Sequence, residues 1–271
     1  MEGRAGTSHL RGNALDKACR ATGSVRRDAR MAGALAVAIA GVALAAAGHP
    51  PPPITSREDV RLSQVLDAHV EACGGMAAFE GMKTRVVVGR IVTDLPTWDP
   101  PVFEVDSVRV YSACPSSYLV THRTSRGTEM EFFDGEEGWK VDVEGKTFEF
   151  KPSDSRSAWL TDPRFSARLE EHFPGMKYLG TTMIDGSSLH VVDIDGDHLH
   201  RLYFDVETGL LVRIGYNRRI LDYRESDGVL VPCEVEHSRK GGSSTFILDH
   251  ITHNVELDER LLSAPVDDAA Y

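Results

Sequence analysis

The chain has 271 residues, enough for one large domain or two small ones, and its composition of 41% hydrophobic and 26% charged residues is typical of a soluble globular protein. The formal net charge at pH 7 is −11. Residues 1–47 hold seven Lys/Arg and three Asp/Glu, which leaves 23 of the 30 basic and 38 of the 41 acidic residues, a net charge of −15, in the rest of the chain. Phosphate backbones bind clustered cations, so this acidic body excludes nucleic acid as a partner.

An N-terminal segment has the pattern of an export signal. Residues 31–48 carry no charge, arginines stand just before them within residues 26–30, and three alanines occupy 45–47. A basic region, an apolar region and a small-residue cleavage site together predict a secretory signal peptide over residues 1–47. The region before the apolar run is long for a signal peptide, so we place the true start near residue 25. Eighteen apolar residues are also the lower limit for spanning a bilayer, which leaves a retained membrane anchor as the alternative.

Four consecutive prolines follow the signal segment. Residues 48–54 therefore predict a stiff polyproline spacer, and residues 55–271 contain no composition shift that would mark a second boundary. We expect residues 55–271 to form one domain, exported to the periplasm or cell envelope.

Helices are expected at the start and in the middle of this domain. Thr55 and Glu58 form a capping box ahead of apolar residues at helical spacing over 59–72, and a short helical turn is expected over 76–82. A helical pattern interrupted near Pro163 covers residues 154–171.

The rest of the domain reads as short strands separated by turn residues. Such a meander predicts a mainly β (α+β) fold in which one curved antiparallel sheet packs its helices on the concave face. The expected strands are residues 84–93, 103–113, 117–124, 129–133, 138–143, 146–151, 178–184, 188–193, 199–206, 210–216, 219–225, 230–237 and 245–253.

Several segments together resemble a known family. They are AHVEACGGMAAFEGMKTRVVVGR at residues 68–90, FFDGEEGWKV at 132–141, RLYFDVETGLLVRI at 201–214, DYRESDGVLVPCEVE at 222–236 and HNVELDERLLSAP at 253–265. Their order resembles the bacterial periplasmic outer-membrane lipoprotein-sorting superfamily of carriers and receptors. The resemblance implies a half-open β-barrel of eleven or so strands, with a helical lid over an apolar cavity for acyl chains. The lid-locking arginine of that family matches no particular residue here, so none is assigned.

This resemblance predicts a non-enzymatic binding protein whose partner is a lipid acyl chain or a lipoprotein. Burial of an acyl chain contributes about 0.8 kcal/mol per methylene, which requires a water-free apolar surface. Any apolar residue proposed to line this cavity could instead belong to a closed hydrophobic core. For Trp139 the alternative is that its side chain packs against the hairpin at residues 134–138. The candidate lining residues are Val86, Val88, Phe103, Leu119, Phe133, Trp139, Phe148, Trp159, Leu160, Leu202, Phe204, Leu211 and Ile214.

Two other functions stay open. The first is a regulatory module of the same fold that senses envelope state by binding a membrane protein complex. The second is a metal-dependent hydrolase: His198 and His200 share one face of an expected strand, and His190 lies on the neighbouring strand. The aspartates at 193–197 resemble a calcium loop, but their spacing departs from the EF-hand pattern.

Catalytic motifs are missing from the sequence. It contains no G-x-S-x-G, H-E-x-x-H or S-x-x-K, so we expect no enzyme activity, no catalytic residue and no cofactor. Removal of the signal segment leaves three cysteines, of which Cys114 and Cys233 are candidates for a disulfide in an oxidising compartment.

Overall fold

The computed structural model describes residues 61–150, 158–194 and 201–262. The expected signal peptide, the spacer and the capping box at residues 55–58 lie outside these ranges. Within them, no helix has the length and hydropathy needed to cross a membrane.

Two helices open the described chain, as expected. Helix α2 spans Leu62–Ala72 and helix α3 spans Met76–Glu80. Helix α2 begins one turn later than the sequence pattern predicts, where the backbone N–H of Arg61 donates to the side chain of Gln64 at 2.7 Å. Gly74, at φ +119°, turns the chain between the helices so tightly that a Cβ there would lie 2.2 Å from the Gly228 carbonyl oxygen.

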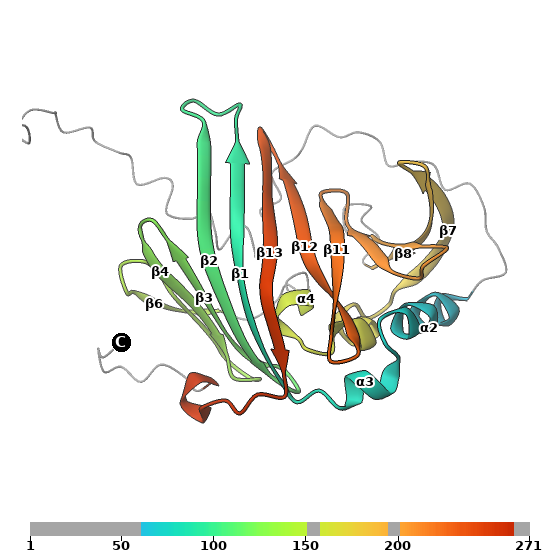
Figure 1. Ribbon diagram of the computed structural model, residues 1–271, viewed down its shortest axis with the longest axis horizontal. Helices are drawn as coiled ribbons and strands as arrows, with labels where there is room; N and C mark the ends of the chain where they lie inside the picture. The colour runs from blue at the N-terminus through green and yellow to red at the C-terminus, as the bar shows by residue number, and fades with distance from the viewer. Residues whose placement is uncertain (1–60, 151–157, 195–200, 263–271) are drawn as a thin grey trace, which may run out of the picture.

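The described strands form one antiparallel sheet that does not close into a barrel. Thirteen strands are described, where the family resemblance implies eleven or so. Their order is β6-β5-β4-β3-β2-β1-β13-β12-β11-β10-β9-β8-β7, so two meanders join where β1 pairs with β13 (Figure 1). The strands are β1 Thr84–Leu95, β2 Val102–Ala113, β3 Ser117–Thr124, β4 Gly127–Phe133, β5 Gly138–Val141, β6 Thr147–Phe150, β7 Lys177–Ile184, β8 Ser187–Asp193, β9 Leu202–Asp205, β10 Leu211–Ile214, β11 Arg218–Ser226, β12 Val229–Arg239 and β13 Gly242–His253.

The middle helical segment is broken into short pieces. They are α4 Ala158–Thr161, the 3-10 helix η2 Phe165–Ala167 and α5 Leu169–His172. Pro163 has no backbone N–H and disfavours helix at the residue before it, which accounts for the break after α4. In Figure 1, α4 is seen between β13 and β12, and it also contacts β2.

The main core lies between these helices and one face of the sheet, which we call the inner face. Trp159 of α4 meets Phe246 of β13 edge-on, with ring centroids 5.4 Å apart. The same cluster takes in buried side chains from the strands of both meanders, among them Val87, Val108, Val110, Val120, Leu202, Phe204, Leu211, Ile214 and Val235. The expected fold, an unclosed antiparallel barrel with helices on one face, is confirmed.

The candidate disulfide between Cys114 and Cys233 is not formed. Cys114 and Cys233 are free thiols in different surroundings: Cys114 Sγ donates to the Met82 carbonyl, whereas Cys233 lies in the main core. Cys73, also free, belongs to a second cluster beneath α2 and α3.

Candidate functional site

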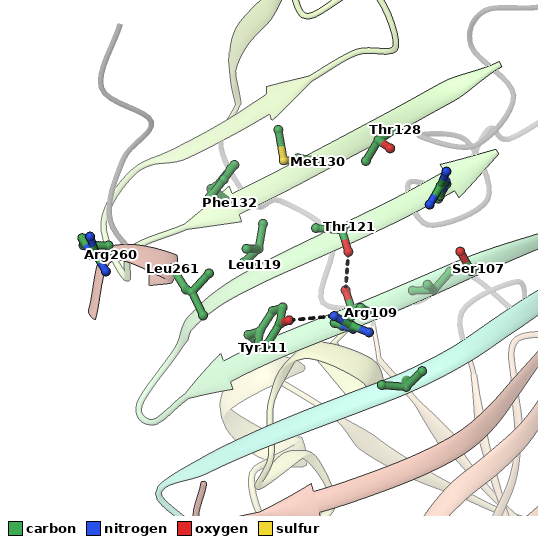
Figure 2. A pocket seen from close by; sticks show the side chains of 13 residues that line it. Ser107, Arg109, Tyr111, Leu119, Thr121, Thr128, Met130, Phe132, Arg260 and Leu261 are labelled. Atoms are coloured by element: carbon green, nitrogen blue, oxygen red, sulfur yellow. Dashed lines mark hydrogen bonds between the residues drawn. The ribbon is translucent and has the colours of Figure 1, made fainter. Parts of the chain in front are cut away.

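A groove of about 440 Å³ lies on the outer face of the sheet, opposite α4 (Figure 2). Its floor is formed by strands β2, β3 and β4, and the 3-10 helix η4, Glu259–Leu262, borders one end. Alternation along β2 separates the faces, because Val108 and Val110 point into the core while Arg109 and Tyr111 line the groove. The lining residues are Val88, Ser107, Val108, Arg109, Tyr111, Leu119, Thr121, Arg123, Thr128, Met130, Phe132, Arg260 and Leu261.

Strand register arranges the floor as three parallel rows. Each row takes one side chain from β2, one from β3 and one from β4, and successive rows are two residues apart along each strand. The first row is Ser107–Arg123–Thr128, the second Arg109–Thr121–Met130 and the third Tyr111–Leu119–Phe132. Polarity therefore falls along the groove, from two hydroxyls and a guanidinium to three large apolar or aromatic side chains.

The third row forms the apolar end. Leu119 is 5% exposed and Phe132 is 7% exposed, although both belong to the face away from the helices. Leu261 of η4 lies over this end, beside Tyr111 and Leu119 (Figure 2). These contacts exclude most water from this end while the groove itself remains open.

Arginines dominate the polar end of the groove. Arg109 Nη1 donates to the Tyr111 hydroxyl at 3.3 Å, and the Thr121 hydroxyl donates to the Arg109 carbonyl at 3.4 Å, as the dashed lines in Figure 2 show. Arg260, at the apolar end, is already paired with Asp258 at 2.6 Å. None of the described residues that line the groove is acidic.

The inner face carries a second arrangement of interest, centred on the buried Arg85. Its Nη2 donates to the Leu160 carbonyl of α4 at 2.5 Å, which fastens the helix to β1. Burial lowers the pKa of Arg85 to about 10, against the opposing effects of the nearby Asp162 and Cys114. The guanidinium thus stays charged at neutral pH.

Asp162 lies beside this contact and ties the helices to one another. Its Oδ2 accepts from His172 Nε2 at 2.7 Å and from Arg168 Nη1 at 3.0 Å, and its Oδ1 accepts from the Arg164 backbone N–H at 2.8 Å. Burial acts to raise the pKa of Asp162, but these hydrogen bonds and the two cations lower it below its ordinary value. Arg168 and Arg164 extend the network to the Pro115 and Met82 carbonyls.

The structure distributes the thirteen predicted lipid-site residues over three environments. Val88 and Leu119 line the outer groove, and Val86 and Trp139 are half-buried on the same face. Phe103 and Phe148 are exposed, at 69% and 43%. Seven residues belong to the inner-face core or pack against it: Phe133, Trp159, Leu160, Leu202, Phe204, Leu211 and Ile214.

The histidines of the hydrolase alternative are described only in part. His190 Nδ1 shares a 3.0 Å hydrogen bond with the Tyr178 hydroxyl, while His198 and His200 lie outside the described residues. In the described ranges, no group of three or more His, Cys, Asp or Glu side chains has an arrangement that could hold a metal ion.

Sequence reasoning missed most of the groove. Arg109 stands between two valines, whereas Arg123 and Met130 have polar or charged neighbours on both sides, so no local pattern common to their strands marks a groove. The available signal was the shared parity of Ser107, Arg109 and Tyr111, which places them on one face of β2. The role of Arg85 could not be seen in the sequence, because its hydrogen-bond partner, the Leu160 carbonyl, is 75 residues away along the chain.

Comparison with known proteins supports the fold. No protein-family model and no curated protein matches the chain. Among solved structures, it is similar to a DUF1329 family protein from Desulfovibrio piger, with a TM-score of 0.52 and 10% identity over 75% of this chain and 97% of that one. It is also similar to a LolA superfamily protein from Nitrosomonas europaea, with a TM-score of 0.50 and 12% identity over 76% and 98% of the two chains. The resemblance to the lipoprotein-sorting superfamily is therefore confirmed as a likeness of fold.

Proposed function

We propose that this protein is a non-enzymatic binding protein of the cell envelope that holds an acyl chain of a lipid or a lipid-modified protein. The observation that carries the proposal is the open groove of about 440 Å³, whose floor runs from arginine and hydroxyl groups to Leu119 and Phe132. Its volume falls within the range of small-molecule sites, roughly 300 to 1,000 Å³. The fold likeness to a LolA superfamily protein supports a lipid as the ligand class.

The groove is a better site than the inner face for a chain entering from water. Trp159 and Leu160 of α4 cover the inner apolar residues, so a ligand would reach them only if the helices moved. The groove needs no such movement, because Met130, Thr121 and Val88 are only partly covered. Val88 and Leu119 remain in the proposed site from the sequence prediction.

Export is part of the same proposal. Residues 1–47 would be removed as a signal peptide, which would leave an acidic mature protein behind the polyproline spacer. The intact mass of the protein purified from the envelope fraction measures this directly. A mature chain beginning near residue 48 supports export with cleavage, and a chain that retains residues 31–48 supports the membrane anchor.

The test of lipid binding is a titration of the full, delipidated protein with decyl maltoside below its micelle concentration, followed by native mass spectrometry. Met130→Glu places a carboxylate on the groove floor and should weaken binding at least tenfold. Met183→Glu is the matched control, because Met183 on β7 is 56% exposed and lies outside the groove. If the wild-type protein bound no single-chain amphiphile, whether uncharged or anionic, the proposed function would be overturned. Equal binding by the Met130→Glu variant would overturn the groove as the site.

A further inference from the structure

We infer that the ligand of the groove is a single-chain amphiphile with an anionic oxygen head, a phosphate or a carboxylate, held by Arg109 and Arg123. This inference rests on the proposed function and adds the class of head group and its direction in the groove. The head lies at the first two rows and the chain runs toward Leu119 and Phe132.

The order of the rows fixes this direction. Arg123 lies between the Ser107 and Thr128 hydroxyls in the first row, and Arg109 follows on β2 in the second row. Guanidinium groups bind phosphate and carboxylate oxygens in a bidentate manner, and flanking hydroxyls can donate further hydrogen bonds. From the first row to the third, the strand rise gives a length of about 14 Å, enough for a head and the first few methylenes of a chain.

The charge of the groove points to an anion. Asp and Glu outnumber Lys and Arg by 41 to 30 in the chain, yet three arginines and no acidic residue are among the described lining residues. Arg260 is neutralised by Asp258 at 2.6 Å, and Arg90, the next cation on this face, is paired with Asp249 at 2.5 Å.

Arg109 and Arg123 differ from these neighbours, because neither forms an ion pair with a carboxylate among the described residues. Arg109 is held by the neutral Tyr111 hydroxyl, which accepts its Nη1–H and leaves its other donors available. Two adjacent rows therefore present guanidinium groups to the same open space, whereas the neighbouring Arg90 and Arg260 already have carboxylate partners. An anionic head group would form ion pairs with Arg109 and Arg123.

The experiment compares ligands that share one chain and differ in head. Decyl phosphate, decanoate and decyl maltoside, each below its micelle concentration, are titrated calorimetrically into the full protein. We expect decyl phosphate and decanoate to bind about tenfold more tightly than decyl maltoside. We also expect added salt to weaken only the two anionic ligands, because the arginines are solvent-accessible.

Two double variants locate the effect. Arg109→Gln/Arg123→Gln should abolish the preference for anionic heads, so that decyl phosphate and decanoate bind no more tightly than decyl maltoside. Arg90→Gln/Arg219→Gln removes the same charge from paired arginines outside the groove and should keep the preference.

The outcomes separate the two proposals. Equal affinities for all three ligands would overturn the inference and leave the proposed function standing, whereas binding of none of them would overturn the proposed function itself. In a last titration, inorganic phosphate alone is added to the protein. If it bound as tightly as decyl phosphate, the site would be an anion site without a place for a chain, and the inference would be wrong.

Discussion

Asp162→Asn tests how the short helices are held on the inner face. Asp162 is 5% exposed and accepts hydrogen bonds from His172, Arg168 and the Arg164 backbone. Asparagine keeps the shape and the backbone contact, so the variant mainly removes the negative charge. Arg168 and the buried Arg85 nearby then lose their counter-charge, and His172 loses a charged hydrogen-bond acceptor.

The size of the effect follows from burial. Removing one partner of a buried ion pair costs about 3–5 kcal/mol. The Arg168 and His172 side chains are 23% and 18% exposed, so solvent screens part of the loss and we expect the lower end, about 3 kcal/mol. For a domain of roughly 200 residues, this corresponds to a fall in Tm of about 6–12 °C.

Equilibrium urea unfolding with a thermal melt measures this loss. Glu171→Gln is the matched control, because Glu171 binds the same Arg168 at 2.7 Å but is 64% exposed. Its loss should cost less than about 1 kcal/mol, as for other surface pairs. If Asp162→Asn were no more destabilising than Glu171→Gln, Asp162 would not be the centre of the helix attachment.

Two further predictions concern the core. Phe204→Ala should lower the free energy of unfolding by about 3–5 kcal/mol, because Phe204 is fully buried. Phe103→Ala is the control and should change the free energy of unfolding little, because Phe103 is 69% exposed. Urea titrations of both variants measure the difference. Burial lowers the pKa of His69 to about 4, although its hydrogen bond with the Gly209 carbonyl acts to raise it. As the pH falls from 6.5 to 4, the unfolded chain therefore binds a proton at this residue before the folded chain does, and the free energy of unfolding declines. His69→Gln should flatten that decline by about 1.4 kcal/mol per pH unit in urea titrations across the range, and an unchanged slope would contradict a neutral buried imidazole.

The strand order could be read from the sequence because turn residues mark the ends of each strand. The expected strand at 117–124 coincides with β3, and the expected ends of most others agree within two or three residues. The helical pattern expected over 154–171, with its interruption near Pro163, corresponds in the described residues to three short helices. Pro163 and the buried, multiply bonded Asp162 interrupt it, which makes three short helices able to follow the curved inner face.

The site was harder to predict. The alternation of side chains along a strand assigns them to two faces of the sheet, but it does not show which face the helices cover. On β3, Tyr118 and Val120 point into the core while Leu119 between them lines the groove, and all three are buried. On β2, the break in alternation between Val105 and Val108 marks a change in which face is apolar. Helix α4 lies on one face of the sheet and η4 on the other, and this placement shows which face holds the core and which holds the groove. The contacts of α4 and η4 with β2 and β3 join residues far apart in the chain, so the sequence pattern does not show them.

The same strands therefore carry the core and the groove back to back. Val108 and Val110, at most 1% exposed, alternate with Arg109, so the groove floor is held in place by a packed core. An acyl chain in the groove should be insensitive to looser helices, whereas a chain beneath α4 should respond strongly to them. Affinity for decyl maltoside, measured on Asp162→Asn below its melting temperature, distinguishes the two sites: an affinity equal to that of the wild-type protein places the chain in the groove, and a severalfold change places it under the helices.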